Sequence, residues 1–322
     1  MLALETIKLT KDYKVGFWKT RSNRVLDSLD LQVQTGEVFG LLGPNGAGKT
    51  TTLKILFRLA FPTSGTARIL GRDLDDITVH QRIGYLPENP YFYEHLTPEE
   101  LLNYVGRLFA IGKDDLRRRV NQLLERVGLA ESRRVPLRKF SKGMVQRVGI
   151  AQALINDPDA VFLDEPMSGL DPLGRHEVRD LVLQLREEKK TVFFSTHILS
   201  DAEMLCDLVA ILNRGRLQGC GELREILRLG VSTTELVLEK PAEGILGVLR
   251  PYVVSVIRTG ERVRLEIHEE TSVAKVLALA LRHKAKIVSL NPVKMSLEDY
   301  FLAHVSSVEG EEPAPAVAAG DR

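Results

Sequence analysis

The stretch Val38-Phe-Gly-Leu-Leu42-Gly43-Pro44-Asn45-Gly46-Ala47-Gly48-Lys49-Thr50-Thr51 decides the fold of this chain. Its first five residues predict a buried strand, and the Gly-rich turn that follows matches G-x-x-x-x-G-K-[ST] and opens a helix near Lys49. A strand, loop and helix in this order form the first unit of a parallel sheet. A chance match in a chain this long has odds on the order of 1%. We therefore interpret the stretch as a phosphate-binding loop.

The loop contains the groups needed to hold a triphosphate. Gly43, Gly46 and Gly48 allow main-chain angles that other residues avoid, so N–H groups can converge on a phosphate at a positive helix N-terminus. We expect Lys49 to reach the β- and γ-phosphates and the Thr50 hydroxyl to bind Mg²⁺. The other predicted contacts of the loop are Pro44, Asn45, Ala47 and Thr51.

A second apolar strand ends in two adjacent carboxylates, in Ala160-Val-Phe-Leu-Asp164-Glu165-Pro166. Alternation along a strand predicts that these two side chains point to different sides. One of them can then hold the Mg²⁺ shell while the other faces the site of an attacking water, and we assign the metal to Asp164 and proton acceptance to Glu165. In isolation the pair would be interpreted as a solvated strand end, and the phosphate-binding loop is what favours the catalytic interpretation.

A third motif, Phe140-Ser141-Lys142-Gly143-Met144, precedes the carboxylates. Ser141 is a good N-cap for a helix over 142–155, which leaves N–H groups free to face an anion. Lys142 faces the positive end of the helix dipole, a local cost of roughly 0.3–1 kcal/mol that a bound phosphate would reverse. The motif resembles the signature of ABC cassettes, commonly Leu-Ser-Gly-Gly-Gln. Its departures are similar to the branch that serves ABC-2 type exporters.

The resemblance to ABC cassettes extends across Ala3–Gly221 and implies roles for single residues. Tyr13 matches the aromatic that stacks on adenine, and Glu88 stands where most members carry a Gln that coordinates Mg²⁺ or orients water. His197 matches the switch histidine on the γ-phosphate, and Asp171 belongs to the D-loop, which crosses to the other subunit. Taken alone, a strand Tyr or a strand-end His is as often a packing or surface residue.

Within the family, Ser141 and Gly143 of one cassette complete the ATP site of its neighbour. One phosphate-binding loop and one signature per chain imply a homodimer or heterodimer that closes on ATP and opens after hydrolysis. A separate membrane-spanning permease converts that motion into transport. The coupling helix of the permease is expected to bind the segment from Glu88 to roughly Gly106. The aromatic residues Tyr91-Phe-Tyr93 of this segment could equally anchor the core.

The resemblance thus implies an ATP-hydrolysing subunit that powers an ABC transporter, an exporter of ABC-2 type, on the cytoplasmic face of the cell (inner) membrane. A GTPase or small-molecule kinase also carries a phosphate-binding loop, but no Asn-Lys-x-Asp motif occurs. A non-transport ABC-type ATPase or a regulatory nucleotide-binding module is the alternative, and such relatives usually have two cassettes or a long coiled coil. A scaffold that does not hydrolyse ATP would be expected to lose Lys49 or Glu165. The cargo is not encoded here, because specificity lies in the permease.

These motifs predict an α/β fold, a P-loop ABC cassette over 1–221. It combines a RecA-like parallel sheet core, an antiparallel β subdomain and an α-helical subdomain at about 89–158. Helical spacing runs through Leu96–Val127 with one break. Near the start, strands at Ile7–Leu9 and Leu29–Val33 are expected to flank a long basic loop, suited to solvent or to a membrane-side contact.

The pattern changes after residue 222. Strand, helix, strand, strand, helix, strand is the order of a ferredoxin-like α+β domain, which we predict over 222–305. A short helix is expected at Ser296–Val305. Residues 306–322, rich in Glu, Pro, Ala and Gly, predict a disordered tail.

Composition limits the partners. Lys plus Arg number 44 against 43 for Asp plus Glu, so no field of one sign predicts binding to nucleic acid, and none is expected. Only Cys206 and Cys220 occur, without a CxxC pattern, so a reducing cytosol is expected. Apolar stretches such as Val161–Leu163 are strand-sized, far short of the roughly 18–20 residues that cross a bilayer.

Overall fold

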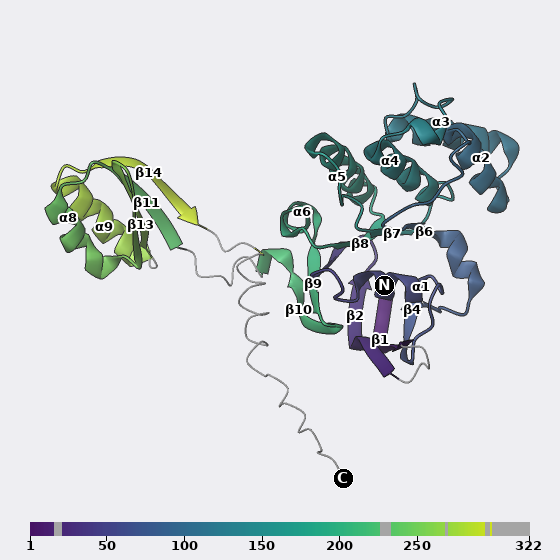
Figure 1. Cartoon of the computed structure of the whole chain (residues 1–322), viewed down its shortest axis with the longest axis horizontal. Helices are drawn as coiled ribbons and strands as arrows, with labels where there is room; N and C mark the ends of the chain where they lie inside the picture. Colours follow the sequence, from purple (N-terminus) through teal and green to yellow (C-terminus); the bar gives the residue numbers. More distant parts are fainter. Residues whose placement is uncertain (16–20, 226–232, 268–269, 294–296, 298–322) are drawn as a thin grey trace, which may run out of the picture. The chain divides into compact units, whose positions relative to one another are not determined.

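The chain divides into two compact units, Met1–Leu223 and Arg224–Arg322 (Figure 1). The computed structural model describes residues 1–15, 21–225, 233–267, 270–293 and 297. Three sequence predictions therefore lie wholly or partly outside the described residues. They concern residues 16–20 of the basic loop, the helix at Ser296–Val305 apart from Leu297, and the tail at 306–322.

A six-stranded sheet forms the centre of the first unit, in the order β10-β9-β3-β8-β7-β6. Neighbouring strands from β9 to β6 run parallel, and β10 pairs antiparallel with β9. The carboxyl ends of the parallel strands share one edge, where Gly43, Glu165 and His197 follow their strands. The bounds are β3 Val38–Leu42, β6 Ile83–Leu86, β7 Ala160–Asp164, β8 Thr191–Thr196, β9 Leu208–Asn213 and β10 Arg216–Glu222.

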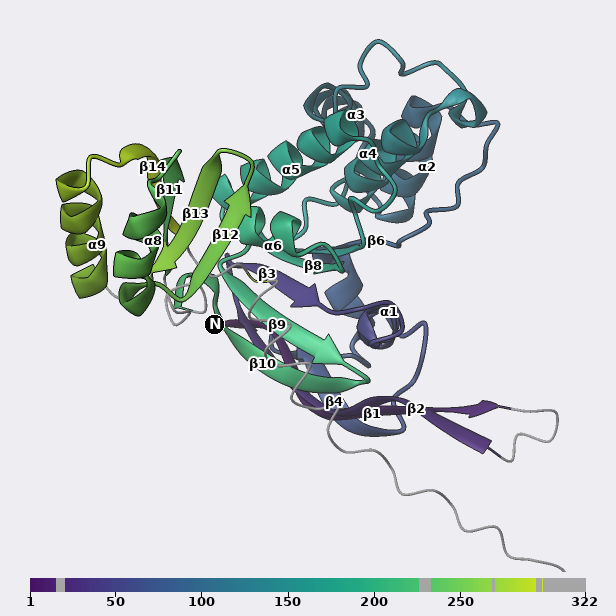
Figure 2. The ribbon, with the colours of Figure 1, turned by 60° about the vertical axis from the view of Figure 1, so that its left-hand side comes forward.

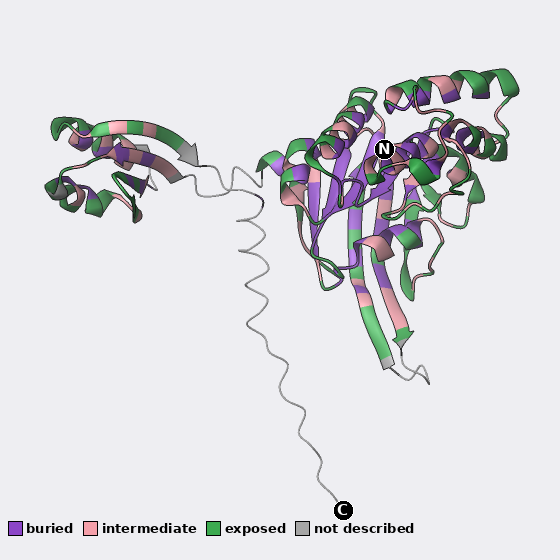
Figure 3. Cartoon of the chain, turned by 45° about the horizontal axis from the view of Figure 1, so that its top comes forward, coloured by how far each residue is buried: buried purple, intermediate pink, exposed green. Residues whose placement is uncertain are grey.

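Every residue of β3, β7 and β8 is buried, as expected for strands covered on both faces (Figure 3). Helices α5 (Pro172–Glu187) and α6 (Leu199–Leu205) cover one face, and α1 (Lys49–Leu56) and the antiparallel sheet cover the other. On the α1 side, Phe39 stacks on Phe193 with 5.3 Å between ring centroids. Phe162 packs 5.6 Å from Phe193, so aromatic contacts tie β3, β7 and β8 together.

The antiparallel sheet has the order β2-β1-β4-β5. The strands predicted at Ile7–Leu9 and Leu29–Val33 are present but far longer, as β1 (Leu2–Val15) and β2 (Arg21–Gln34). Pairing continues to Val15 opposite Arg21, so the described residues of the expected basic loop belong to β1 and β2, and these paired strand ends project from the sheet in Figure 2. An ion pair of 2.9 Å between Arg24 and Asp12 supports this extension. The shorter strands are β4 Ser64–Ile69 and β5 Arg72–Asp73.

Helices inserted between β6 and β7 form the helical part. The predicted spacing and break are confirmed as α2 (Pro98–Leu108) and α3 (Lys113–Arg126). Thr97 and Glu100 form a capping box that fixes the start of α2. Helix α4 (Lys142–Ala153) follows, and short 3₁₀ turns occupy η1 Ile77–Arg82 and η2 Leu137–Lys139.

The second unit has its own core, which includes Leu236, Leu249, Leu265 and Val276. Its antiparallel sheet has the order β12-β13-β11-β14, which confirms the predicted ferredoxin-like arrangement. Among the described residues, no helix is long and apolar enough to span a bilayer. The bounds are β11 Thr233–Glu239, α8 Glu243–Leu249, η3 Arg250–Tyr252, β12 Ser255–Thr259, β13 Arg262–Ile267, α9 Glu270–Arg282 and β14 Lys286–Val293.

Candidate nucleotide site

The phosphate-binding loop joins β3 to α1, and the packing beneath it explains its glycines. A Cβ added at Gly43 would lie 2.2 Å from the main-chain O of Leu212 in β9, so only glycine fits against that strand. Gly46 and Gly48 have φ values of 82° and 113°, a region that residues with side chains rarely adopt. The neighbouring elements therefore hold the loop in one conformation at the carboxyl edge of the sheet.

Lys49 is only 5% exposed, and its amine lies within the loop. Nζ donates to the main-chain O of Gly43 at 2.7 Å and of Pro44 at 3.2 Å, and it lies 3.1 Å from Oε1 of Glu165. An ammonium has three N–H donors. All three have acceptors here, so a phosphate that binds Lys49 must compete with Glu165.

Glu165 follows β7 in a left-handed conformation, with φ of 49°. Its main-chain N–H donates to Oγ of Ser195 at 2.9 Å and to the main-chain O of the same residue at 3.2 Å. Strand alternation therefore does not set the direction of Glu165, contrary to the prediction, because the strand ends at Asp164. The Glu165 carboxylate lies between the side chains of Lys49 and His197, with Oε2 2.8 Å from Nδ1 of His197.

Asp164 is 1% exposed and is held by two hydroxyls. Its Oδ1 accepts hydrogen bonds from Ser195 Oγ at 2.6 Å and from Thr50 Oγ1 at 3.2 Å. Its Oδ2 is buried and has no hydrogen-bond partner among the described residues. Burial raises the pKa of Asp164 and outweighs the two hydrogen bonds, and the carboxylates of Glu88 and Glu165 raise it further.

A divalent cation fits this corner of the site. The unpartnered Oδ2 of Asp164, the Thr50 hydroxyl and the Glu88 carboxylate supply oxygen, the ligand type that Mg²⁺ prefers. No cluster of three or more His, Cys, Asp or Glu side chains in the described part of the chain could hold a metal alone. Mg²⁺ usually takes one or two carboxylates together with substrate phosphates and water.

A cavity of about 280 Å³ opens over these groups. The structure thus brings the predicted loop, Glu88, Glu165 and His197 to one place, with Asp164 buried beside them. Its lining consists of Val25, Asn45, Gly46, Gly48, Lys49, Thr50, Thr51, Glu88, Glu165, Ser168 and His197.

Two residues of this site were not predicted from the motifs. Ser195 holds both Asp164 and the main chain of Glu165, and Val25 of β2 forms one wall. Ser195 had a signal in the sequence, because the polar pair Ser195-Thr196 ends an otherwise apolar strand at the same sheet edge. Val25 had none, since its place depends on how the antiparallel sheet packs.

Ser141, Gly143 and Asp171 lie together in a different cavity, of about 340 Å³. Ser141 caps α4 as predicted, since its Oγ accepts from the main-chain N–H of Met144 at 3.3 Å. Asp171 caps α5 in the same way, accepting from the N–H of Gly174 at 2.9 Å. No described residue lines both this cavity and the phosphate-loop cavity. One chain therefore presents the two sets of residues separately.

Tyr13 lines neither of these two cavities. Its ring, on β1, lies next to the amine of Lys11, with 4.8 Å from Nζ to the ring centroid. Stacking of Tyr13 on adenine stays a prediction.

Comparison with known proteins agrees with this geometry. A sequence model of the ABC transporter family matches residues 26–168, from β2 to Ser168. An ABC transporter ATP-binding protein of Synechocystis is 46% identical over 301 residues, covering 93% of this chain and 83% of the relative. The chain belongs to the family of ABC transporter ATP-binding proteins. A Nod factor export ATP-binding protein of Cupriavidus metallidurans is 35% identical over 286 residues, covering 86% of this chain and 91% of the relative.

Solved structures confirm the predicted ABC cassette fold. A dimeric ATP-binding cassette in a post-hydrolysis state, bound to ADP and phosphate, aligns with a TM-score of 0.63 and 27% identity. The alignment covers 69% of this chain and 99% of that one. Cassettes of this family bind ATP. In one chain of this protein, Lys49 and Ser141 line two different cavities.

Asp164→Asn should stabilise the metal-free cassette at neutral pH. Burial raises the pKa of Asp164 above its ordinary 3.8, so the folded state is penalised once this carboxyl ionises. The gain should shrink as the pH falls toward 3.8, because protonation then removes the buried charge from the wild-type protein. Urea unfolding with a chelator, from about pH 4 to 8, measures this.

Added Mg²⁺ should reverse the order of the two proteins, because the cation favours the ionised carboxylate. Asp75→Asn is the matched control, since that side chain is 87% exposed and should show a far smaller change. A loss of stability in Asp164→Asn at neutral pH with chelator present contradicts the assignment.

Proposed function

We propose that this cassette binds ATP and Mg²⁺ between its own phosphate-binding loop and the Ser141 helix of a second cassette, hydrolyses the ATP, and powers a separate permease. The separation of the two cavities carries the proposal. The Lys49 cavity offers a buried cation and loop N–H groups, and the Ser141 cavity offers a helix N-terminus. Both suit phosphate, and neither encloses it alone. The related cassette bound to ADP and phosphate is dimeric.

The contacts of Lys49 suggest how binding leads to chemistry. The γ-phosphate takes over the Lys49 N–H that now faces Glu165, and the Glu165 carboxylate is released to accept a proton from water. His197, 2.8 Å from Glu165, orients that carboxylate and reaches the phosphate from the end of β8. Mg²⁺, held by Thr50, Asp164 and Glu88, supplies the positive charge that offsets the phosphates.

A groove on the helical part is the surface we assign to the permease. It has a volume of about 260 Å³ and is lined by aromatic and aliphatic side chains of β6, the 87–93 segment and α2, together with Gly149 and Gln152 of α4. Tyr91 and Tyr93 are 89% and 59% exposed, whereas Phe92 is half-buried and points toward Gly149 of α4. The three aromatics thus combine one anchor with two outward rings, which suits an inserted helix of a partner.

Export across the cell (inner) membrane from its cytoplasmic face is the direction we infer. The Phe-Ser-Lys-Gly-Met signature at 140–144 resembles ABC-2 type exporters, and a relative that shares most of the chain is named for Nod factor export. Both Cys206 and Cys220 are free thiols, which suits the reducing cytosol.

Glu165→Gln should lower the rate of ATP hydrolysis about 10²–10⁴-fold, the range expected for loss of a positioned proton acceptor. It should also trap an ATP-dependent dimer and tighten ATP binding, because Lys49 loses its ion pair with Glu165. Phosphate release, gel filtration with ATP, and nucleotide titration measure the three effects.

Glu187→Gln is the matched control, the same change at an exposed residue that ends α5 and does not line the phosphate-loop cavity. It should retain turnover. Unchanged turnover in Glu165→Gln removes Glu165 from its role, and a trapped dimer without ATP removes the nucleotide from the interface.

Lys142→Ala should weaken ATP-driven dimerisation about tenfold, the effect of one charge-assisted hydrogen bond. The Lys142 amine lies against Gly169, since a Cβ added at Gly169 would be 2.3 Å from Nζ, so it lines the Ser141 cavity. The monomer itself should not be destabilised, because Lys142 opposes the dipole of α4. Sedimentation with and without ATP measures dimerisation.

Lys139→Ala is the control for Lys142→Ala. Lys139 is exposed, ends η2 a few residues earlier and does not line the cavity. Equal or tighter dimers in Lys142→Ala contradict a phosphate-facing amine.

A further inference from the structure

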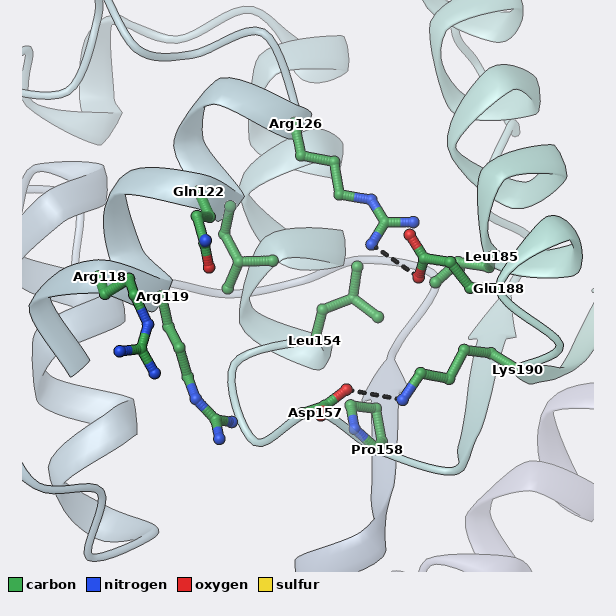
Figure 4. A pocket seen from close by; sticks show the side chains of 11 residues that line it. Arg118, Arg119, Gln122, Arg126, Leu154, Asp157, Pro158, Leu185, Glu188 and Lys190 are labelled. Atoms are coloured by element: carbon green, nitrogen blue, oxygen red, sulfur yellow. Dashed lines mark hydrogen bonds and ion pairs between the residues drawn. The ribbon is translucent and has the colours of Figure 1, made fainter. Parts of the chain in front are cut away.

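A basic cavity of about 340 Å³ lies at the edge of the sheet opposite the nucleotide. Asp157 and Pro158 in its lining come just before β7, and Lys190 comes just before β8, so both mark the amino ends of those strands. The other wall is α3, which contributes Arg118, Arg119, Gln122, Leu123 and Arg126 (Figure 4). We propose that this cavity is a second anion site, which takes a small phosphate-bearing ligand.

The charges of the lining favour an anion. Four cationic side chains, Arg118, Arg119, Arg126 and Lys190, face two acidic ones, Asp157 and Glu188, and Arg118 is paired with Asp115 of its own helix. The hydrogen bond from Lys190 to Asp157, 2.6 Å long, lowers the pKa of Asp157 and offsets its charge. Glu188 is likewise offset by Arg126, at 3.1 Å.

Two arginines keep binding capacity after these pairs are formed. Arg119 forms no ion pair with any described residue, and its recorded hydrogen bond goes to the main-chain O of Ile155 at 3.2 Å. Arg126 uses Nη1 for Glu188, whereas its Nε and Nη2 are buried without a partner in the described part of the chain. Unsatisfied buried donors are costly, so a small rotation of this guanidinium toward an anion is favourable.

The chemistry of the donors selects the class of ligand. Guanidinium groups bind phosphate oxygens in a planar, two-pronged manner, and Lys190 adds a point charge. The apolar side of the cavity is formed by the buried Leu123, Leu154 and Leu185, which exclude water beneath the charged rim. In Figure 4, the arginines of α3 and the Glu188–Lys190 turn approach the same space from opposite sides. A free phosphate compound and a lipid headgroup share the required chemistry.

An anion here would bridge two parts of the cassette. Helix α3 belongs to the helical part, and Glu188 and Lys190 belong to the turn between α5 and β8 of the sheet part. Among the described residues, direct links from α3 across the cavity include the pair Arg126–Glu188 and the Arg119 hydrogen bond. A ligand held by Arg119, Arg126 and Lys190 would add bonds across the same gap, independently of the nucleotide.

Isothermal calorimetry with inorganic phosphate tests the site on the full chain. Saturating Mg²⁺ and a non-hydrolysable ATP analogue first fill the phosphate-binding loop. Wild type should bind phosphate, and Arg126→Gln and Arg119→Gln should each weaken it about tenfold, as for one charge-assisted hydrogen bond. Glu188→Gln should tighten it several-fold, because it frees Nη1 of Arg126 and removes a negative charge. A folding defect cannot tighten binding, so this variant keeps the test decisive.

Arg82→Gln is the matched control. Arg82 lies on the same sheet edge, pairs with Asp159 at 2.7 Å and does not line the cavity, so its loss should leave phosphate binding unchanged. Flotation with phosphatidylcholine vesicles, with and without phosphatidic acid, forms the second arm. Binding of vesicles but not free phosphate, with the same variant pattern, identifies a lipid headgroup. The proposal is overturned if no binding occurs in either arm, or if Arg126→Gln and Glu188→Gln bind as tightly as the wild type.

Discussion

A positive charge buried at Lys49 is the constraint on which the nucleotide site depends. A cation that is only 5% exposed must find negative partners, because an unpaired buried charge is among the costliest features of a fold. The main-chain O atoms of Gly43 and Pro44 take two donors, and Glu165 takes the third. The pairing holds the Glu165 carboxylate at the phosphate-binding loop, where a phosphate must compete with it for Lys49.

The parallel sheet makes this pairing possible. Lys49 follows β3, Glu165 follows β7 and His197 follows β8, and the parallel register places the three strand ends side by side. Ser195 completes the arrangement, because its hydroxyl is donor to Asp164 and acceptor for the Glu165 N–H. One serine thus links both carboxylates, and a change there would affect the positions of Asp164 and Glu165 together.

The sequence predicted those features that depend on local pattern, and missed those that depend on distant packing. Strand, loop and helix at 38–56, the Ser141 cap and the ferredoxin-like order of the second unit all follow from spacing and residue type. The left-handed turn at Glu165 does not, because Ser195, thirty residues away, imposes it. The length of the β1–β2 hairpin was underestimated, since cross-strand pairs such as Arg24–Asp12 stabilise strands without apolar alternation.

Glu88 adds a negative charge to this site, which a glutamine at the same position would not. With Asp164 and Glu165 it makes three carboxylates around the phosphate-binding loop, beside the buried cation Lys49. The charge of Glu88 contributes to the raised pKa of Asp164, so it increases the cost of the metal-free ionised site. The same charge strengthens the attraction for Mg²⁺. Closure of the cassette on ATP should therefore be coupled more tightly to the metal than in relatives with a neutral side chain at this position.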